Sequence, residues 1–138
     1  YILWPEDIQN VAKHLWMYLR KKFGLQDLGI VITDSKTTPL RWGTTGVGIG
    51  FWGFHPLKDY RGDQDLFGRD FKWTMLNHVD ALASAANYAM GEGSESTPFA
   101  IIEEADKLEF QDGDFWEDLI VDQQQNEAKT ISKLKSMS

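Results

Sequence analysis

The sequence predicts an α+β fold in which helices pack on a mixed or antiparallel sheet. Apolar residues recur at helical spacing near the start of the chain and again in an alanine-rich segment at residues 74–90. A β-branched run at residues 28–33 and a glycine-alternating run at residues 46–54 are typical of strands. The glycine-rich run suits antiparallel pairing, so the pattern favours α+β over a doubly wound sheet.

The first helix is expected to begin after Asp7, whose side chain suits an N-cap. Lys21 and Lys22 suit the negative end of the helix dipole, and Gly24 suits its end. Apolar residues follow one another at helical spacing between these limits: Ile8, Val11, Ala12, Leu15, Trp16 and Leu19.

The middle of the chain alternates strands and loops. Residues 28–33 (LGIVIT) are expected to form a buried strand, followed by a loop at residues 33–43. Residues 46–54 (GVGIGFWGF) are expected to form a strand that other backbone approaches closely. Residues 58–70 are charged and contain two glycines, which indicates an exposed loop.

The second half begins with a predicted helix at residues 74–90, ended by Gly91. Residues 98–102 (PFAII) are expected to form a second short buried strand, and residues 115–120 one more helix. The last dozen residues are expected to fray. We therefore divide the chain into an α+β domain at residues 1–112 and a helical tail at residues 113–138.

Charge and composition exclude several classes of function. The chain has 138 residues, a net charge of −7 and an isoelectric point near 4.8, which argues against nucleic acid or an anionic membrane as partner. It has no cysteine, so it forms no disulfide or zinc–thiolate site, and we expect a cytoplasmic protein. No apolar run reaches the roughly 18 residues of a membrane span. The chain begins at Tyr1 and not at Met, so we expect a further amino-terminal part.

Asp34 and Ser35 follow the predicted strand at residues 28–33 and are candidate ligands of a metal ion. A carboxylate at the end of a buried strand, with a hydroxyl beside it, suits a hard cation. The alternative is that Asp34 only caps a turn through its own backbone. Arg41 could clamp a phosphate or carboxylate with two parallel hydrogen bonds, or pair with acids at the surface.

Two further segments carry candidate residues. The charged segment KDYRGDQDLFGRD either pairs its charges internally or presents Arg61 or Arg69 to a charged substrate. In MGEGSESTP, Gly91 and Gly93 allow a tight backbone path whose N–H groups could contact a nucleotide, although a helix end with a flexible loop has the same pattern. The GVGIG run is neither a Walker loop nor a dinucleotide fingerprint, which leaves packing as its role.

The order of these segments resembles the coenzyme F-420-0:L-glutamate ligase family. LWPED, IVITDSKTTPLRWGTTGVGIG, KDYRGDQDLFGRD, VDALASAANYAMGEG and TPFAII follow one another between about residues 3 and 103. The resemblance implies GTP-dependent amide formation between L-glutamate and the carboxylate of a phospholactyl-deazaflavin. The implied path is phosphoryl transfer to that carboxylate, followed by attack of the glutamate amine.

The resemblance also implies roles for residues. Asp34 and Ser35 occupy the positions of the family's metal-binding Asp-Thr pair, with Mg²⁺ or Mn²⁺ as the ion. The nucleotide contacts of the family's Met-Gly-Glu-Gly turn fall on Met90, Gly91, Glu92 and Gly93. Arg41 and Arg61 are the candidate catalytic residues, and an intertwined homodimer is the implied assembly.

Three departures from the family pattern leave a second function open. An upstream Gly-Ile-Asp-x-Ser-Asn motif is absent, Thr37 and Thr38 replace a Gly-Arg pair, and Asp80-Ala81 replaces Asp-Glu. These departures indicate either a partial copy of the ligase or a diverged relative. The alternative to a ligase is therefore a non-catalytic module that binds a small ligand or dimerises on the same scaffold.

Overall fold

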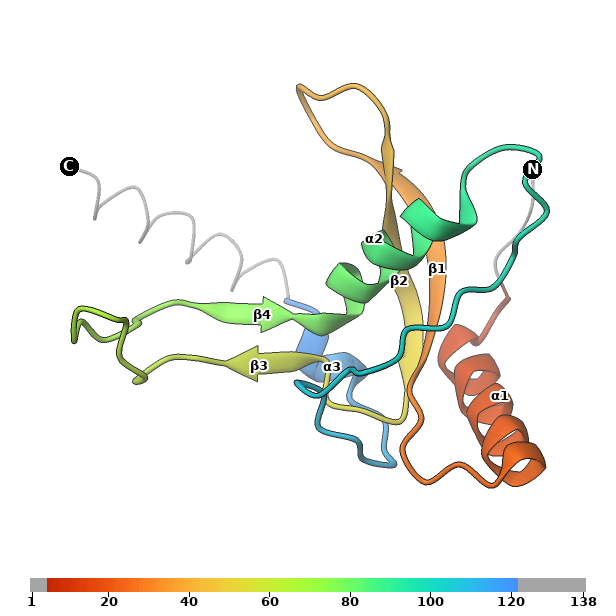
Figure 1. The fold of residues 1–138 in the computed structure, drawn as a ribbon, viewed down its shortest axis with the longest axis horizontal. Coiled ribbons are helices and arrows are strands. Elements are labelled where there is room, and N and C mark those ends of the chain that lie inside the picture. The colour runs from red at the N-terminus through yellow and green to blue at the C-terminus, as the bar shows by residue number, and fades with distance from the viewer. Residues whose placement is uncertain (1–4, 122–138) are drawn as a thin grey trace.

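The computed structural model describes residues 5–121 and has an α+β architecture (Figure 1). Its strands form two separate antiparallel ribbons, β1–β2 and β3–β4, which confirms the α+β class with small antiparallel sheets. Figure 1 shows α2 crossing the β1–β2 ribbon, with α1 to one side and the β3–β4 ribbon projecting to the other. The elements are α1 (Ile8–Phe23), β1 (Ile30–Thr37), β2 (Thr44–Trp52), β3 (Leu57–Asp59), β4 (Met75–Asn77), α2 (His78–Met90) and α3 (Trp116–Leu119).

Helix α1 begins and ends at the predicted residues. The Asp7 carboxylate accepts a hydrogen bond from the backbone N–H of Asn10 at 2.9 Å. Gly24 adopts a left-handed conformation with φ of 65°, and its N–H donates to the carbonyl of Arg20. A helix start favours a short polar side chain, and a left-handed helix end favours glycine. Both preferences are local, so the sequence predicts both ends of the helix.

Strand β1 is longer than predicted. The sequence expectation of a strand ending at Thr33 and a loop beginning there is wrong, because β1 continues to Thr37 and pairs with β2 from Thr44 onward. The register shifts between Ile32 and Thr33, and one residue later, between Thr33 and Asp34, the strand changes from half-buried to exposed. A run of apolar residues predicts only the buried half of a strand. It does not reveal that the same strand continues through polar residues.

The glycines of β2 allow α2 to approach the strand closely. A Cβ on Gly46 would lie 2.3 Å from the carbonyl oxygen of Ala83, and a Cβ on Gly48 would lie 2.2 Å from a methyl group of Val79. Both neighbours belong to α2. This confirms that the glycine-alternating run serves packing.

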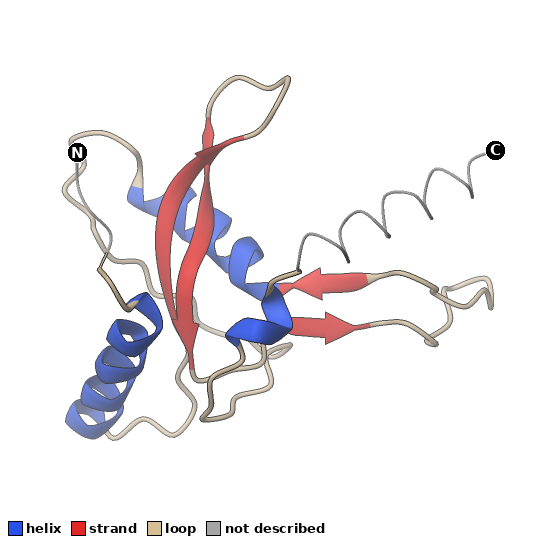
Figure 2. Cartoon of the chain, turned by 180° about the vertical axis from the view of Figure 1, so that it is seen from behind, coloured by secondary structure: helices blue, strands red, loops and turns tan. Residues whose placement is uncertain are grey.

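The β3–β4 ribbon refines one expectation and overturns another. Most of the exposed loop expected at residues 58–70 is present, but residues 58–59 belong to β3. The second helix does not begin at residue 74, because β3 pairs with β4 before the helix starts. The Asn77 side chain accepts a hydrogen bond from the N–H of Asp80 at 3.0 Å and so fixes the first turn of α2. We call residues 57–77 the arm, and both views show it projecting from the rest of the chain (Figure 2).

The predicted strand at residues 98–102 is wrong. The segment is irregular, with Phe99 82% and Ile101 89% exposed. Pro98 has no N–H to donate, and no described strand pairs with the segment. An apolar run predicts a buried strand only when a sheet edge and a covering layer are available to it.

Two groups of buried side chains form the core. One consists of Ala12, Trp16 and Trp52 between α1 and β2, and the indole N–H of Trp16 donates to the carbonyl of Leu28 at 2.7 Å. The other consists of Phe51, Phe54 and Val79 between β2 and α2, and Phe115, Trp116 and Leu119 pack against it.

The short helix α3 falls within the predicted helical segment at residues 115–120. The division of the chain at residue 112 stays a prediction, and the predicted fraying of the tail lies outside the described residues. Among residues 5–121, no helix has the length and apolar character that a membrane crossing requires.

Candidate functional site

Asp34 and Ser35 lie within β1 and not at its end, so the predicted position of this pair is corrected. Asp34 is paired with Val47 and Ser35 with Gly46 in the β1–β2 ladder. Both residues are exposed, two residues beyond the point where the register shifts. The Asp34 carboxylate accepts a hydrogen bond from the N–H of Ser35 at 2.7 Å. Asp34 and Ser35 are thus consecutive residues in the exposed half of β1, joined by this backbone hydrogen bond.

Glu92, in the turn that follows α2, contacts Ser35 of this pair. The hydroxyl of Ser35 lies 2.7 and 2.8 Å from the two carboxylate oxygens of Glu92 and donates to them. The amide of Asn87, in the last turn of α2, donates to the same carboxylate. Gly91 ends α2 with its N–H on the carbonyl of Asn87, and this turn brings Glu92 back to β1. We call Asp34, Ser35, Thr44, Asn87 and Glu92 the Glu92 cluster.

The electrostatics of the Glu92 cluster favour an ionised carboxylate. The hydrogen bond from Ser35, and next that from Asn87, hold the pKa of Glu92 below its usual value, and Thr44 adds to this effect. Desolvation by neighbouring atoms and the negative charge of Asp34 act in the opposite direction. The negative charge of Asp34 thus weakly opposes ionisation of Glu92, and a cation near Glu92 would offset that effect.

The donor set of the Glu92 cluster fits a hard divalent cation. Carboxylate and hydroxyl oxygens are the ligands that Mg²⁺ and Mn²⁺ prefer, and Mg²⁺ commonly takes one or two carboxylates together with substrate phosphates. Among the described residues, no three or more His, Cys, Asp or Glu side chains gather into a group that could hold a metal ion. Asp34, Ser35 and Glu92 can therefore supply only part of a coordination shell.

The four residues predicted to contact a nucleotide lie together at the end of α2. Met90 is the last residue of the helix, and Gly91 to Gly93 form the turn that carries Glu92. The hydroxyl of Thr97 donates to the carbonyl of Met90 at 2.6 Å and closes the loop. The candidate metal residues and the candidate nucleotide residues, which are more than fifty positions apart in sequence, are thus brought into contact through Ser35 and Glu92.

Arg41 lies at the same end of the β1–β2 ribbon as the Glu92 cluster. It sits in the exposed loop that joins the two strands, and its N–H donates to the carbonyl of Thr38 at 3.2 Å. Only two residue pairs of the ladder, Lys36 with Thr45 and Thr37 with Thr44, separate Ser35 from this loop.

Arg61 lies on the arm, outside the Glu92 cluster. Its guanidinium binds both carboxylate oxygens of Asp59, with the shortest contact at 2.6 Å, and Arg69 pairs with Asp65 at 3.0 Å. The pairing lowers the pKa of Asp59 to about 2, mainly through the side-chain hydrogen bond from Arg61. These contacts confirm that the charged segment pairs internally.

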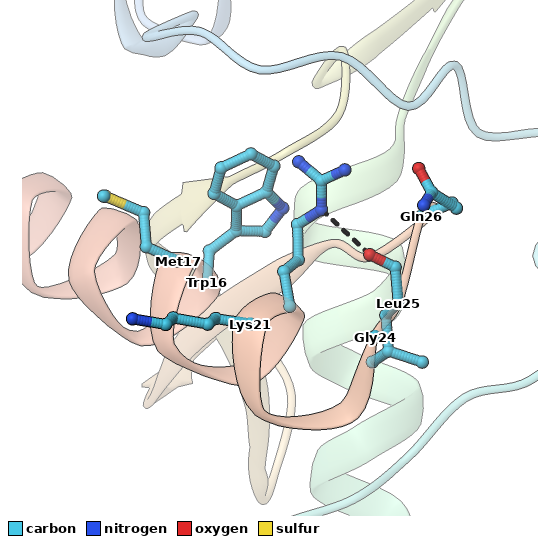
Figure 3. Close-up of a pocket in the computed structure, with 7 residues that line it drawn as sticks. Trp16, Met17, Lys21, Gly24, Leu25 and Gln26 are labelled. Atoms are coloured by element: carbon cyan, nitrogen blue, oxygen red, sulfur yellow. Dashed lines mark hydrogen bonds between the residues drawn. The ribbon is translucent and has the colours of Figure 1, made fainter.

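Two pockets among the described residues lie away from the Glu92 cluster. A pocket of about 420 Å³ surrounds the end of α1, between Trp16, Met17 and Leu25 (Figure 3). Arg20 lies over the Trp16 ring, and its Nε donates to the carbonyl of Leu25 at 3.1 Å. A neighbouring pocket of about 250 Å³ shares Trp16 and Arg20. Neither is lined by residues of the Glu92 cluster.

Sequence reasoning missed two members of the Glu92 cluster, Asn87 and Thr44. Asn87 is a polar residue in the last turn of an alanine-rich helix, and this is the single local signal that sets it apart. Thr44 fell between the loop expected at residues 33–43 and the strand expected from residue 46, whereas β2 begins at Thr44. Their meeting with Glu92 depends on the path of the turn after α2, which no spacing in the sequence reveals.

Comparison with known proteins decides the family. The family model described as F420-0:Gamma-glutamyl ligase matches residues 1–104. The chain belongs to this family. The ligase-family match contains both strands of the β1–β2 ribbon, the arm and the turn at Glu92, so the whole Glu92 cluster lies inside it.

Curated relatives of the ligase family agree with this assignment. The coenzyme F420:L-glutamate ligase of Methanopyrus kandleri is 45% identical over 100 residues, which cover 72% of this chain and 39% of the relative. The ligase of Methanocaldococcus jannaschii is 44% identical over 98 residues, covering 71% and 39%. That of Haloarcula marismortui is 35% identical over 105 residues, covering 76% and 40%. The chain spans about two fifths of the length of the curated relatives it matches.

Proposed function

We propose that this chain forms part of a GTP- and divalent-metal-dependent ligase that joins L-glutamate to a carboxylate substrate through an amide bond. The relatives are named for ligation of L-glutamate to coenzyme F420, and this chain shares their family. The observation that carries the proposal is the contact between Ser35 and Glu92, which unites the candidate metal and nucleotide residues.

We assign each candidate residue a role in binding the metal, the nucleotide or the substrate. Asp34, Ser35 and Glu92 hold Mg²⁺ or Mn²⁺ through oxygen atoms, and the ion screens the charge of the nucleotide phosphates. Met90, Gly91 and Gly93 offer backbone to the nucleotide, and Arg41 meets a phosphate or the substrate carboxylate from the adjacent loop. Arg61 would meet substrate only from the arm, and its role stays a prediction.

In the proposed reaction, GTP supplies the free energy for amide formation. A carboxylate oxygen of the substrate attacks the terminal phosphorus of GTP, and GDP leaves. The amine of L-glutamate then attacks the acyl carbon, phosphate leaves, and the nitrogen loses a proton as the amide forms. The protein's contribution is to position the reacting groups and to stabilise the developing negative charge.

Calorimetric titration with Mn²⁺, with and without GDP, tests this proposal on the complete protein. We expect Asp34→Ala to weaken Mn²⁺ binding by about tenfold or more, because it removes one of two carboxylate ligands. Asp63→Ala is the matched control, since it removes the same charge from the arm. Equal Mn²⁺ binding by wild type and Asp34→Ala would remove the proposed metal site.

A second function, small-ligand binding without turnover, is favoured by one observation. The described residues supply only a partial coordination shell to the ion, and a site of this kind could bind without reacting. Glutamate-dependent GTP hydrolysis distinguishes the two functions: turnover would exclude the non-catalytic module, and its absence from a protein that binds Mn²⁺ and GDP would exclude the ligase.

We also propose that two copies associate and that they act in the cytoplasm, where GTP is supplied. Large apolar side chains are exposed over the loop at Arg41, the arm and α2, and surfaces of this kind commonly mark protein interfaces. These side chains are Leu40, Trp42, Leu66, Phe67, Trp73 and Tyr88. Light scattering of the complete protein tests the association, and a monomeric mass at micromolar concentration would contradict it.

A further inference from the structure

The turn that carries Glu92 also contains a second glutamate, which folds back onto the backbone of the turn. The N–H of Gly93 donates to a carboxylate oxygen of Glu95 at 2.7 Å. The Met90 carbonyl and the Thr97 hydroxyl close the same loop at 2.6 Å, so Glu95 lies inside a closed loop of eight residues. The carboxylate is therefore held by the loop and is not simply extended into solvent.

Glu95 also lies against the backbone of Gly91. A Cβ on Gly91 would lie 2.4 Å from the Glu95 carboxyl carbon and 2.6 Å from one of its oxygens. A Cβ on Gly93 would lie 3.3 Å from the other oxygen. Glycine at both positions leaves room for an oxyanion to touch the main chain, and Glu95 fills that room in this structure.

A carboxylate and a phosphate compete for the same kind of site. Both are anions whose oxygens accept hydrogen bonds from backbone N–H groups in glycine-rich turns. Glu95 supplies a negative charge and an acceptor at Gly93, so a phosphate oxygen that used this N–H would have to displace it. Ser96, the next residue, has a left-handed φ of 56°, an unfavourable conformation for a residue with a Cβ.

We propose that Glu95 is an internal competitor that occupies the phosphate-binding backbone of the turn and must swing out before a nucleotide binds there. The inference rests on the proposed nucleotide site and adds a built-in gate to it. The apparent Kd for nucleotide then equals the intrinsic Kd divided by the fraction of molecules in which Glu95 has swung out. When nucleotide is absent, the gate keeps the N–H of Gly93 hydrogen-bonded.

Two variants and one matched control test the gate. Glu95→Gln keeps the size of the side chain and removes its charge, and Glu95→Ala removes the competing group altogether. Titration of the complete protein with GDP and Mn²⁺ should give an apparent Kd about fivefold lower for either variant than for wild type. Glu103→Gln makes the same charge change eight residues further along the chain and should leave the Kd within about twofold of wild type.

The amide resonance of Gly93 provides an independent readout without nucleotide. Replacement of Glu95 by Ala should shift this resonance upfield, because a hydrogen bond to a carboxylate is lost. An unchanged Gly93 resonance, or a Kd for GDP that is equal or higher in both variants, would overturn the gate while leaving the nucleotide site intact. Failure of wild type and both variants to bind GDP would overturn the nucleotide site itself, and the gate with it.

Discussion

The β1–β2 ribbon and the arm are both two-stranded antiparallel hairpins, but helices cover only the first (Figures 1 and 2). α2 packs directly on the glycines of β2, whereas the arm projects and pairs its own charges. The Glu92 cluster is built on the covered ribbon. The candidate site therefore adjoins the helix that packs on β2, whereas the arm is held mainly by contacts within itself.

The largest expected difference between the two regions comes from a matched pair of phenylalanines. Phe54 is fully buried in the core beneath α2, whereas Phe67 at the tip of the arm is 82% exposed. Phe54→Ala should lower the free energy of unfolding by about 4 kcal/mol, because it leaves a cavity. Phe67→Ala should change it by less than about 0.5 kcal/mol.

Urea denaturation of the two phenylalanine variants gives both free energies directly. An equally large loss of stability on Phe67→Ala would show that the tip of the arm is buried in solution, against another copy or another part of the protein. That result would contradict the description of the arm as exposed and of the β1–β2 ribbon alone as packed.

A matched pair of glycines sharpens the same contrast. Gly46→Ala places a Cβ 2.3 Å from a backbone oxygen of α2, so the helix must move, and we expect a loss of about 3 kcal/mol. Gly62 on the arm has no atom within 4 Å of its Cβ position, but its φ is 91°. Gly62→Ala should therefore cost only about 1 kcal/mol, from backbone strain.

Thermal or urea unfolding measures both glycine effects, and Mn²⁺ binding separates them further. Gly46→Ala should also weaken Mn²⁺ binding, because α2 carries Asn87 and leads to Glu92. A Gly46→Ala protein with wild-type stability would show that α2 does not pack on β2 as described.

The smallest effect is expected from the ion pair of the arm. The pKa of Asp59 is lowered from 3.8 to about 2 by Arg61, so the pair adds stability above pH 3.8 that is lost as pH falls toward 2. Because both side chains are exposed, solvent screens the pair and its effect on folding is small. Arg61→Gln should return the pKa of Asp59 toward 3.8.

Carboxyl-carbon NMR titration of Asp59 measures this change. A pKa that stays near 2 in Arg61→Gln would mean that another group lowers it, and that Arg61 is available to a substrate. High salt should move the wild-type value in the same direction as the substitution.

Local chemistry explains which parts of the fold the sequence predicts. The limits of α1 follow from Asp7 and Gly24, and the packing role of Gly46 and Gly48 follows from their alternation. The strand expected at residues 98–102 fails because its pairing depends on a partner that local sequence does not specify. The start of α2 was missed because Met75 and Leu76 suit a helix as well as the short strand they form.

The candidate site was predicted in separate pieces. Asp34, Ser35 and Glu92 could be named from motifs, but their contact depends on the turn at Gly91 and on the exposed half of β1. Asn87 and Glu95 lie in segments that the sequence singled out, but nothing there marked these two residues, since such hydrogen bonds leave no spacing pattern in the chain.

The position of a bound cation tests the account most directly. In crystals of the complete protein grown with Mn²⁺ and GDP, we predict an anomalous difference peak within about 2.3 Å of carboxylate oxygens of both Asp34 and Glu92. The Ser35 hydroxyl should then have turned from Glu92 to the ion. A fully bound Mn²⁺–GDP pair whose metal lies away from both carboxylates would contradict the account.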